Sequence, residues 1–210
     1  MLGFWKSKPL TDFDGALSRE DLIHRARIAL IDDEVPVLLE HMRKSLFSVD
    51  HDVSGDDLRN YEAQLYDVAI VDYYGVGQSL GQGQGLDLLK HIKRVSPGTR
   101  LIAYTSRSLS AVESEFFRLS HVVLPKDMGL GDSMELIEGQ IRRALSKEHL
   151  FEALVTKLSL SDAAERAKMQ AALTKALGSK DKGRFKEYVA RAAGVTAEKT
   201  VEAMIGKLFL

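Results

Sequence analysis

The stretch IALIDD at residues 28–33 is a short aliphatic run that ends in two adjacent carboxylates. Runs of this length and composition are typical of strands in a parallel sheet that helices cover on both faces. Three later runs follow the same pattern, and each leads into a polar or charged side chain. These runs are residues 68–71 before Asp72, residues 101–104 before Thr105, and residues 122–124 before Pro125 and Lys126.

Amphipathic helical patterns lie between these runs. Apolar side chains recur at helical spacing in three segments, which predicts one helix in each. The apolar positions are Val35, Leu38, Leu39, Met42 and Leu46, then Leu86, Leu89 and Ile92, then Val112, Phe116 and Leu119. Strands that alternate with such helices predict parallel βα units and therefore an α/β fold with a doubly wound sheet.

The polar residues at the strand ends are expected to converge, because the carboxyl ends of parallel strands form one edge of the sheet, where ligands bind. Taken alone, the pair Asp32 and Asp33 also fits the acidic first turn of a helix. Together with Asp72 it would form a carboxylate cluster, in which two charges about 4 Å apart repel by roughly 4 kcal/mol near a protein surface. Oxygen ligands suit Mg²⁺, and Lys126 would supply the remaining positive charge.

This set of residues, in this order, resembles the receiver domain of bacterial two-component response regulators over roughly residues 26–147. The resemblance implies a five-stranded, flavodoxin-like fold with Asp72 as the phosphoacceptor. Asp72 would take a phosphoryl group from the phosphohistidine of a sensor histidine kinase or a phosphotransfer protein. Thr105 would hydrogen-bond the phosphoryl oxygen, and Lys126 would contact the phosphoryl group or Asp72. Transfer would be self-catalysed, with only slow autodephosphorylation, so the protein is not expected to be an enzyme.

The same resemblance implies Mg²⁺ as the cofactor. Asp33 would ligate the ion directly, and Asp32 would act through a water molecule. Asp72 and the backbone carbonyl of Tyr74 would complete the protein ligands. The chemistry that this arrangement implies is mostly positioning and charge neutralisation.

The chain departs from the family pattern at four places. A Gly-rich loop at residues 75–85 is longer than the usual loop after the phosphoacceptor, which costs little closure entropy and predicts a mobile segment. Pro125 precedes Lys126, whereas many members have Pro after the Lys. Val123 stands where a switch aromatic is common, which argues against the usual aromatic readout. The segment between Asp33 and Asp72 is short, so the second strand, around residues 52–53, and its helix should be abbreviated.

The composition is that of a globular chain of 210 residues without cysteine. The lack of cysteine excludes a disulfide scaffold and a Cys-ligated metal. The six histidines lack zinc-site spacing, and we expect them to be surface or half-buried residues. No run approaches the eighteen or so consecutive apolar residues of a membrane span, and residues 1–20 lack the apolar core of a signal peptide. We therefore expect a cytoplasmic protein without membrane association.

We divide the chain into an N-terminal extension (1–25), the receiver-like domain (26–147) and an all-helical C-terminal domain (148–210). From Ser133 onward the pattern is helical alone, and its apolar face continues through Phe151 to Leu158. This predicts that the last receiver helix runs on without a break. A long amphipathic helix could pair with a second chain, so a homodimer is one hypothesis and packing within the chain is the other.

The C-terminal domain is mildly basic. Residues 146–210 carry 12 Lys and Arg against 8 Asp and Glu, a net charge of +4. Residues 185–208 resemble a degenerate helix-turn-helix, in which Val201 falls one residue late for its docked face. The early second-helix residues Ala197, Glu198 and Lys199 suit neither phosphates nor bases. A solvated helical surface is therefore favoured over a nucleic-acid partner.

These patterns favour a response regulator of a phosphorelay. Phosphorylation of Asp72 would shift an equilibrium between two receiver conformations and thereby switch the helical C-terminal module. Two alternatives remain. One is a receiver-like adaptor that acts without phosphorylation, and the other is a DNA-binding regulator that uses residues 185–208.

Overall fold

The computed structural model describes residues 8–63, 65–106, 113–193 and 199–210. The strands are β1 (Arg27–Ile31), β2 (Ser48–Asp52), β3 (Val68–Asp72), β4 (Arg100–Thr105) and β5 (Val122–Pro125). The helices are α1 (Arg19–Arg25), α2 (Val37–Lys44), α3 (Leu58–Glu62), α4 (Gly85–Val95), α5 (Glu113–Leu119), α6 (Leu130–Ala144), α7 (Lys147–Lys157), α8 (Ala163–Ser179), α9 (Lys182–Ala193) and α10 (Lys199–Leu208). Two 3-10 turns are η1 (Leu10–Phe13) and η2 (Gln78–Leu80).

The chain forms two compact units. One comprises Leu17–Ala144, and the other joins Leu145–Leu210 to the described residues that precede Leu17. The predicted N-terminal extension is thus divided between the units. Its second half forms α1, which Ser18 and Asp21 begin with a reciprocal capping box.

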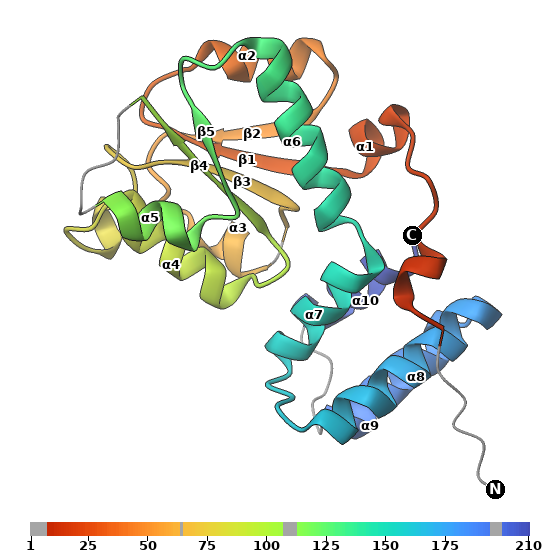
Figure 1. The fold of residues 1–210 in the computed structure, drawn as a ribbon. Coiled ribbons are helices and arrows are strands. Elements are labelled where there is room, and N and C mark those ends of the chain that lie inside the picture. The colour runs from red at the N-terminus through yellow and green to blue at the C-terminus, as the bar shows by residue number, and fades with distance from the viewer. Residues whose placement is uncertain (1–7, 64, 107–112, 194–198) are drawn as a thin grey trace, which may run out of the picture. The chain divides into compact units, whose positions relative to one another are not determined.

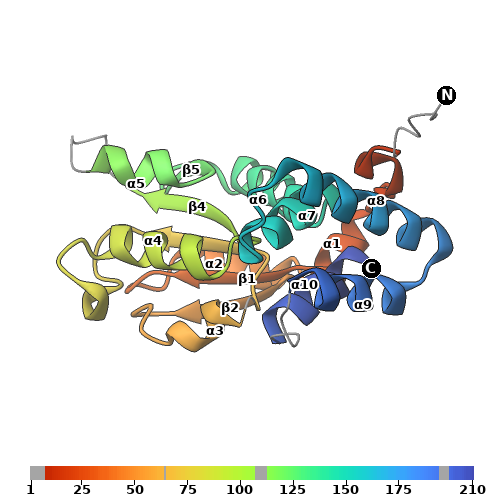
Figure 2. The ribbon, with the colours of Figure 1, turned by 90° about the horizontal axis from the view of Figure 1, so that it is seen from below.

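The first unit is built on a parallel five-stranded sheet with the order β2-β1-β3-β4-β5. Figure 2 shows β2 and β5 at the opposite edges of this sheet. Helices α2 and α6 cover one face, and α3, α4 and α5 cover the other (Figure 1). All five residues of β3 are buried, which explains why its sequence is an apolar run without alternation. The predicted doubly wound α/β fold, followed by helical segments, is confirmed.

The sheet register sets the positions of the strand ends. Ile31 of β1 pairs with Val71 of β3, so Asp32 and Asp72 are the next residues along two adjacent strands. Tyr104 of β4 pairs with Asp72, and Pro125 of β5 pairs with Thr105. The second strand, predicted around residues 52–53, is β2, which ends at Asp52. The expectation that it is abbreviated is wrong, because β2 has five residues, as β1 and β3 do. Its helix α3 is short, with five residues.

The prediction that the last receiver helix runs on without a break is wrong. Helix α6 ends at Ala144, and a new helix, α7, begins after Ser146. The Ser146 hydroxyl accepts a hydrogen bond from the backbone N–H of His149, which is the arrangement of an N-cap. The continuous amphipathic helix on which the homodimer hypothesis depended is therefore not formed.

The second unit is a helical bundle with a core of its own. Its buried side chains include Phe151 of α7, Leu173 of α8, Phe185 of α9 and Met204 of α10. Helix α8 begins after Asp162, whose carboxylate accepts hydrogen bonds from two backbone N–H groups. Val201 is also buried in this core. The turn of the suggested helix-turn-helix, residues 194–198, lies outside the described residues.

Among the helices formed by described residues, none combines the length and apolar character that crossing a membrane would require.

Candidate functional site

Three carboxylates meet at the carboxyl edge of the sheet. Asp32 and Asp33 directly follow β1, and Asp72 is the last residue of β3. Each of the three offers an oxygen atom, and these three atoms all lie within 4.8 Å of one another. Asp32 is fully buried, Asp72 is 7 % exposed and Asp33 is exposed. The convergence expected from the parallel strands is thus present for all three.

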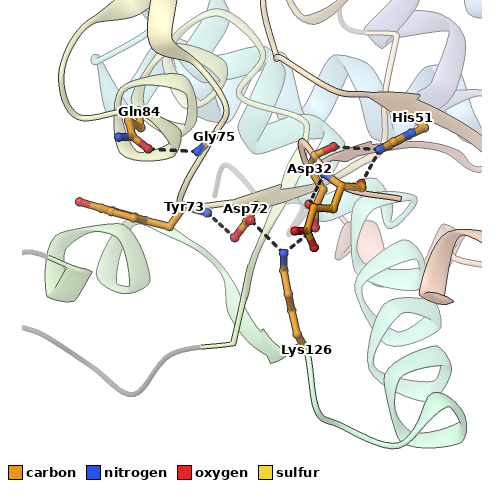
Figure 3. Close-up of polar contacts among 8 residues, drawn as sticks. Asp32, His51, Asp72, Tyr73, Gly75, Gln84 and Lys126 are labelled. Atoms are coloured by element: carbon orange, nitrogen blue, oxygen red, sulfur yellow. Dashed lines mark hydrogen bonds and ion pairs between the residues drawn. The ribbon is translucent and has the colours of Figure 1, made fainter. Parts of the chain in front are cut away.

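Lys126, which follows β5, extends its ammonium group between two of these carboxylates (Figure 3). Its Nζ atom donates a hydrogen bond of 2.9 Å to Oδ2 of Asp72. The same atom lies 2.7 Å from Oδ2 of Asp32. The Lys126 side chain is only 23 % exposed, so water screens these ion pairs less than it screens pairs at the surface.

Asp32 keeps one oxygen poorly satisfied. Its Oδ1 accepts a hydrogen bond of 3.0 Å from the backbone N–H of Glu34. Its Oδ2 is buried and accepts no well-directed hydrogen bond from the described residues, although Lys126 is close enough for an ion pair. One ammonium therefore faces two carboxylates, with Asp33 beside them. An oxygen-only donor set with excess negative charge fits a hard divalent cation such as Mg²⁺.

The electrostatics of the site are asymmetric. Burial raises the pKa of Asp72, and Lys126 only partly opposes this because nearby Asp32 also raises it. Burial alone would lower the pKa of Lys126, but its contacts with Asp32 and Asp72 outweigh burial and raise it. The difference follows from the charges, since Lys126 has two anionic neighbours whereas Asp72 shares a single cation. The metal-free site, with three carboxylates and one ammonium, therefore carries excess negative charge.

Neutralising Asp72 is therefore expected to stabilise the metal-free protein. A carboxyl group whose pKa is raised on folding binds more protons in the folded state than in the unfolded state. The free energy of unfolding therefore falls as the pH rises from the ordinary pKa of the group, 3.8, through its raised pKa in the folded protein. Asp72→Asn should unfold at a higher urea concentration than the wild type at pH 7 with EDTA. The gain should disappear near pH 3. The control is Asp127→Asn, at an exposed carboxylate. A lower stability of Asp72→Asn than of the wild type at pH 7, with no such loss in the control, would contradict this prediction.

Asp33 lies against the start of the Gly-rich loop. Gly75 adopts φ +77°, and a β-carbon built on it would lie 2.1 Å from Oδ2 of Asp33. Glycine is therefore needed for the close approach as well as for the backbone conformation. The loop itself is held in place: Gln84 accepts a hydrogen bond from the N–H of Gly75, and the N–H of Gly77 donates to the carbonyl of Ser54.

Gly75→Ala is expected to weaken Mg²⁺ binding about tenfold, because the added methyl group must displace the Asp33 carboxylate from the cluster. Calorimetric titration with Mg²⁺ measures this. Gly139→Ala is the matched control, because a β-carbon at Gly139 would meet no atom within 4 Å. Equal affinities for the two variants would show that Asp33 needs no such clearance.

The remaining predicted site residues lie at the same edge of the sheet. Thr105 ends β4 and is buried, and its carbonyl accepts a hydrogen bond of 2.8 Å from the N–H of Lys126. The ring of Tyr104 lies beneath the Lys126 ammonium, with Nζ 5.1 Å from the ring centroid. Tyr74, two residues past Asp72, is 38 % exposed. The carbonyl of Tyr74 as a metal ligand stays a prediction.

Three contacts escaped the sequence reasoning. The backbone N–H of Tyr73 donates a 2.7 Å hydrogen bond to Oδ1 of Asp72, and the Tyr73 ring packs edge-on against Phe116 of α5. His51, expected as a surface or half-buried residue, is half-buried, but its ring contacts the backbone of the Asp32 loop (Figure 3). No motif marks these contacts, because each depends on the local path of the backbone and on side-chain packing rather than on a pattern in the sequence.

Comparisons with family models and with curated proteins find no match. Among solved structures, NtrX from Brucella abortus in complex with ATP has 16 % identity and a TM-score of 0.51 over 72 % of this chain and 34 % of that chain. A CheY-like response regulator receiver domain protein from Methanospirillum hungatei has 17 % identity and a TM-score of 0.48 over 57 % of this chain and 95 % of that chain. A two-component response regulator from Clostridium difficile has 17 % identity and a TM-score of 0.48 over 57 % of this chain and 98 % of that chain.

At sequence identities this low, structural similarity is evidence for the fold only. The chain spans about a third of the NtrX structure, at 34 % of its length. The sheet order and the strand directions, together with the likeness to the NtrX structure, agree on the fold. The chain therefore has the five-stranded, flavodoxin-like fold that the sequence predicts.

Proposed function

We propose that this protein is a response regulator that accepts a phosphoryl group on Asp72 with the help of Mg²⁺. The observation that carries the proposal is the cluster of Asp32, Asp33 and Asp72 with Lys126 between two of its members. The donor would be the phosphohistidine of a sensor kinase or a phosphotransfer protein. The fold shared with receiver domains supports the same assignment.

In the proposed reaction, a carboxylate oxygen of Asp72 forms a bond to phosphorus while the bond from phosphorus to the donor imidazole nitrogen breaks. The electron pair stays on that nitrogen, and a proton from water or a donor-side group restores the neutral imidazole. Mg²⁺ held by the three carboxylates would neutralise charge on the phosphoryl oxygens. Lys126 would keep its contact with Asp32 and donate to a phosphoryl oxygen in place of Asp72.

Thr105 would then report the phosphoryl group. It lies next to Lys126 across the β4–β5 ladder and is the last residue of β4, directly before the segment that leads to α5. A hydroxyl drawn toward the phosphoryl group would bias the end of β4 between two arrangements. The helical unit formed by α7–α10 is the proposed recipient of the signal.

A single incubation tests the proposal. The protein is treated with acetyl phosphate and Mg²⁺, and its intact mass is measured with and without hydroxylamine. We expect a gain of one phosphoryl group that hydroxylamine removes, because acyl phosphates react with this nucleophile. The gain should be lost when EDTA replaces Mg²⁺. An unmodified protein under all conditions would reject phosphoryl transfer and favour an adaptor that uses the fold only for protein contacts.

A further inference from the structure

The backbone of Asp32 is held from both sides by the neighbouring edge strand β2. Its N–H donates a 3.2 Å hydrogen bond to the carbonyl of Asp52, which continues the β1–β2 ladder beyond Ile31. Its carbonyl lies 2.9 Å from Nε2 of His51. The same ring nitrogen lies 3.1 Å from the carbonyl of Glu34. His51 thus joins the two ends of the turn that carries Asp32 and Asp33.

The chemistry of these contacts defines the state of the ring. Both partners of Nε2 are carbonyl oxygens, which only accept hydrogen bonds. Nε2 must therefore carry a proton, whatever the state of Nδ1. The contact to Asp32 is the shorter of the two, so the N–H is shared between the carbonyls with Asp32 as the closer acceptor.

The strand that presents His51 is itself anchored. Asp52, the next residue, accepts hydrogen bonds from the backbone N–H groups of Ser54 and Gly55 on one oxygen. Its other oxygen accepts a 2.9 Å hydrogen bond from the hydroxyl of Tyr61, a buried residue of α3. The end of β2 therefore has little freedom to move, and a ring fixed to it can restrain the turn of residues 32–34.

The restraint acts on the carboxylates that face one another. Three like charges within a few ångströms push the turn outward, and the only ammonium among them contacts Asp32 and Asp72 but not Asp33 in the described part of the chain. Figure 3 shows Asp32 between His51 on one side and Lys126 on the other. The ring holds the backbone and the ammonium holds the side chain.

We infer that His51 is a positioning residue of the site: its Nε2–H fixes the turn of residues 32–34 so that Asp32 and Asp33 are pre-arranged to hold the divalent cation. His51 does not touch the ion or the phosphoryl group. The inference rests on the proposed function, because it concerns the metal that phosphoryl transfer to Asp72 would use. Groups that orient metal ligands commonly change metal affinity by about 10- to 100-fold when they are removed.

Two substitutions separate the hydrogen bond from the bulk of the ring. His51→Leu removes the donor and keeps an apolar side chain of similar reach, whereas His51→Gln places an amide N–H near the position of Nε2. We expect His51→Leu to weaken calorimetric Mg²⁺ binding about tenfold or more, and His51→Gln to stay within about threefold of the wild type. His41→Leu, at another half-buried histidine on α2, is the matched control and should bind like the wild type.

Hydrogen exchange of the metal-free proteins gives a readout that is independent of activity. The Glu34 amide donates to Oδ1 of Asp32 within the turn. The Glu34 amide hydrogen should exchange about tenfold faster or more in His51→Leu than in the wild type, because one hydrogen bond of ordinary strength that restrains the turn is lost. In His51→Gln its exchange rate should return toward that of the wild type. Nitrogen NMR of the wild-type imidazole should show a protonated Nε2, which provides a test even if the leucine variant does not fold.

The outcomes are distinguishable. Wild-type protein that neither binds Mg²⁺ nor gains a phosphoryl group would overturn the proposed function and this inference together. Wild-type protein that does both, with equal Mg²⁺ affinity in His51→Leu and His41→Leu, would overturn the inference alone. A ring protonated only at Nδ1 would do the same. Weaker binding in the leucine variant with recovery in the glutamine variant would support it.

Discussion

Asp72→Asn is expected to abolish phosphorylation of the protein by acetyl phosphate in the presence of Mg²⁺. The amide of asparagine is a far weaker nucleophile than a carboxylate and provides no second anionic oxygen for the cation. In the structure, Asp72 ends β3 and contacts Lys126, and it is the one residue of this buried strand that keeps some exposure, at 7 %. Intact-mass measurement should show a single unmodified species.

The control for this variant is Asp127→Asn. Asp127 is an exposed carboxylate directly after Lys126, so its loss changes the net charge by the same amount near the same site. This control should gain the phosphoryl group as the wild type does. Persistent, hydroxylamine-sensitive phosphorylation of Asp72→Asn at the wild-type level would mean that the nucleophile is another residue.

Lys126→Met is expected to be the most destabilising single change at the site. It leaves Asp32 and Asp72 facing each other in a largely buried setting without their shared cation. Removing one partner of a buried ion pair costs about 3 kcal/mol or more, because the remaining charge stays desolvated. Urea unfolding at pH 7 in EDTA should show a loss of this size. Saturating Mg²⁺ should reduce the loss, because the ion supplies positive charge to the same carboxylates.

The same variant should also transfer phosphate about a hundredfold more slowly, since a positioned donor to the phosphoryl oxygens is lost. Lys90→Met is the matched control. Lys90 pairs with Glu115 at the surface, where both side chains are more than 40 % exposed, and such pairs contribute about 1 kcal/mol or less. If Lys126→Met were as stable as Lys90→Met in EDTA, the ammonium would not compensate the carboxylates as described.

The strand ends were predictable because two regularities act together. A fully buried parallel strand is an apolar run, and the ends of neighbouring parallel strands share one edge. Asp32, Asp33, Asp72, Thr105 and Lys126 could therefore be assigned to one edge from their positions alone. The structure gathers the three carboxylates within 4.8 Å of one another, brings Lys126 into contact with Asp32 and Asp72, and places Thr105 next to Lys126 in the ladder.

Other features could not be read from periodicity. The apolar face of α6 continues in phase into α7, so the pattern hides the break that the Ser146 cap introduces. The contact of His51 with the Asp32 carbonyl depends on an imidazole ring that reaches from the end of β2 to the turn after β1. The clearance at Gly75 depends on the path of a single loop.

A crystal structure of the protein with Mn²⁺ and beryllofluoride would test the central claim most directly, since it reports the cation and a phosphoryl mimic together. The account predicts an anomalous peak for Mn²⁺ among the carboxylates of Asp32, Asp33 and Asp72. It also predicts beryllofluoride joined to Asp72, with the Lys126 ammonium in contact with it. A metal peak elsewhere, or an unmodified Asp72 still paired with Lys126 under saturating conditions, would contradict the account.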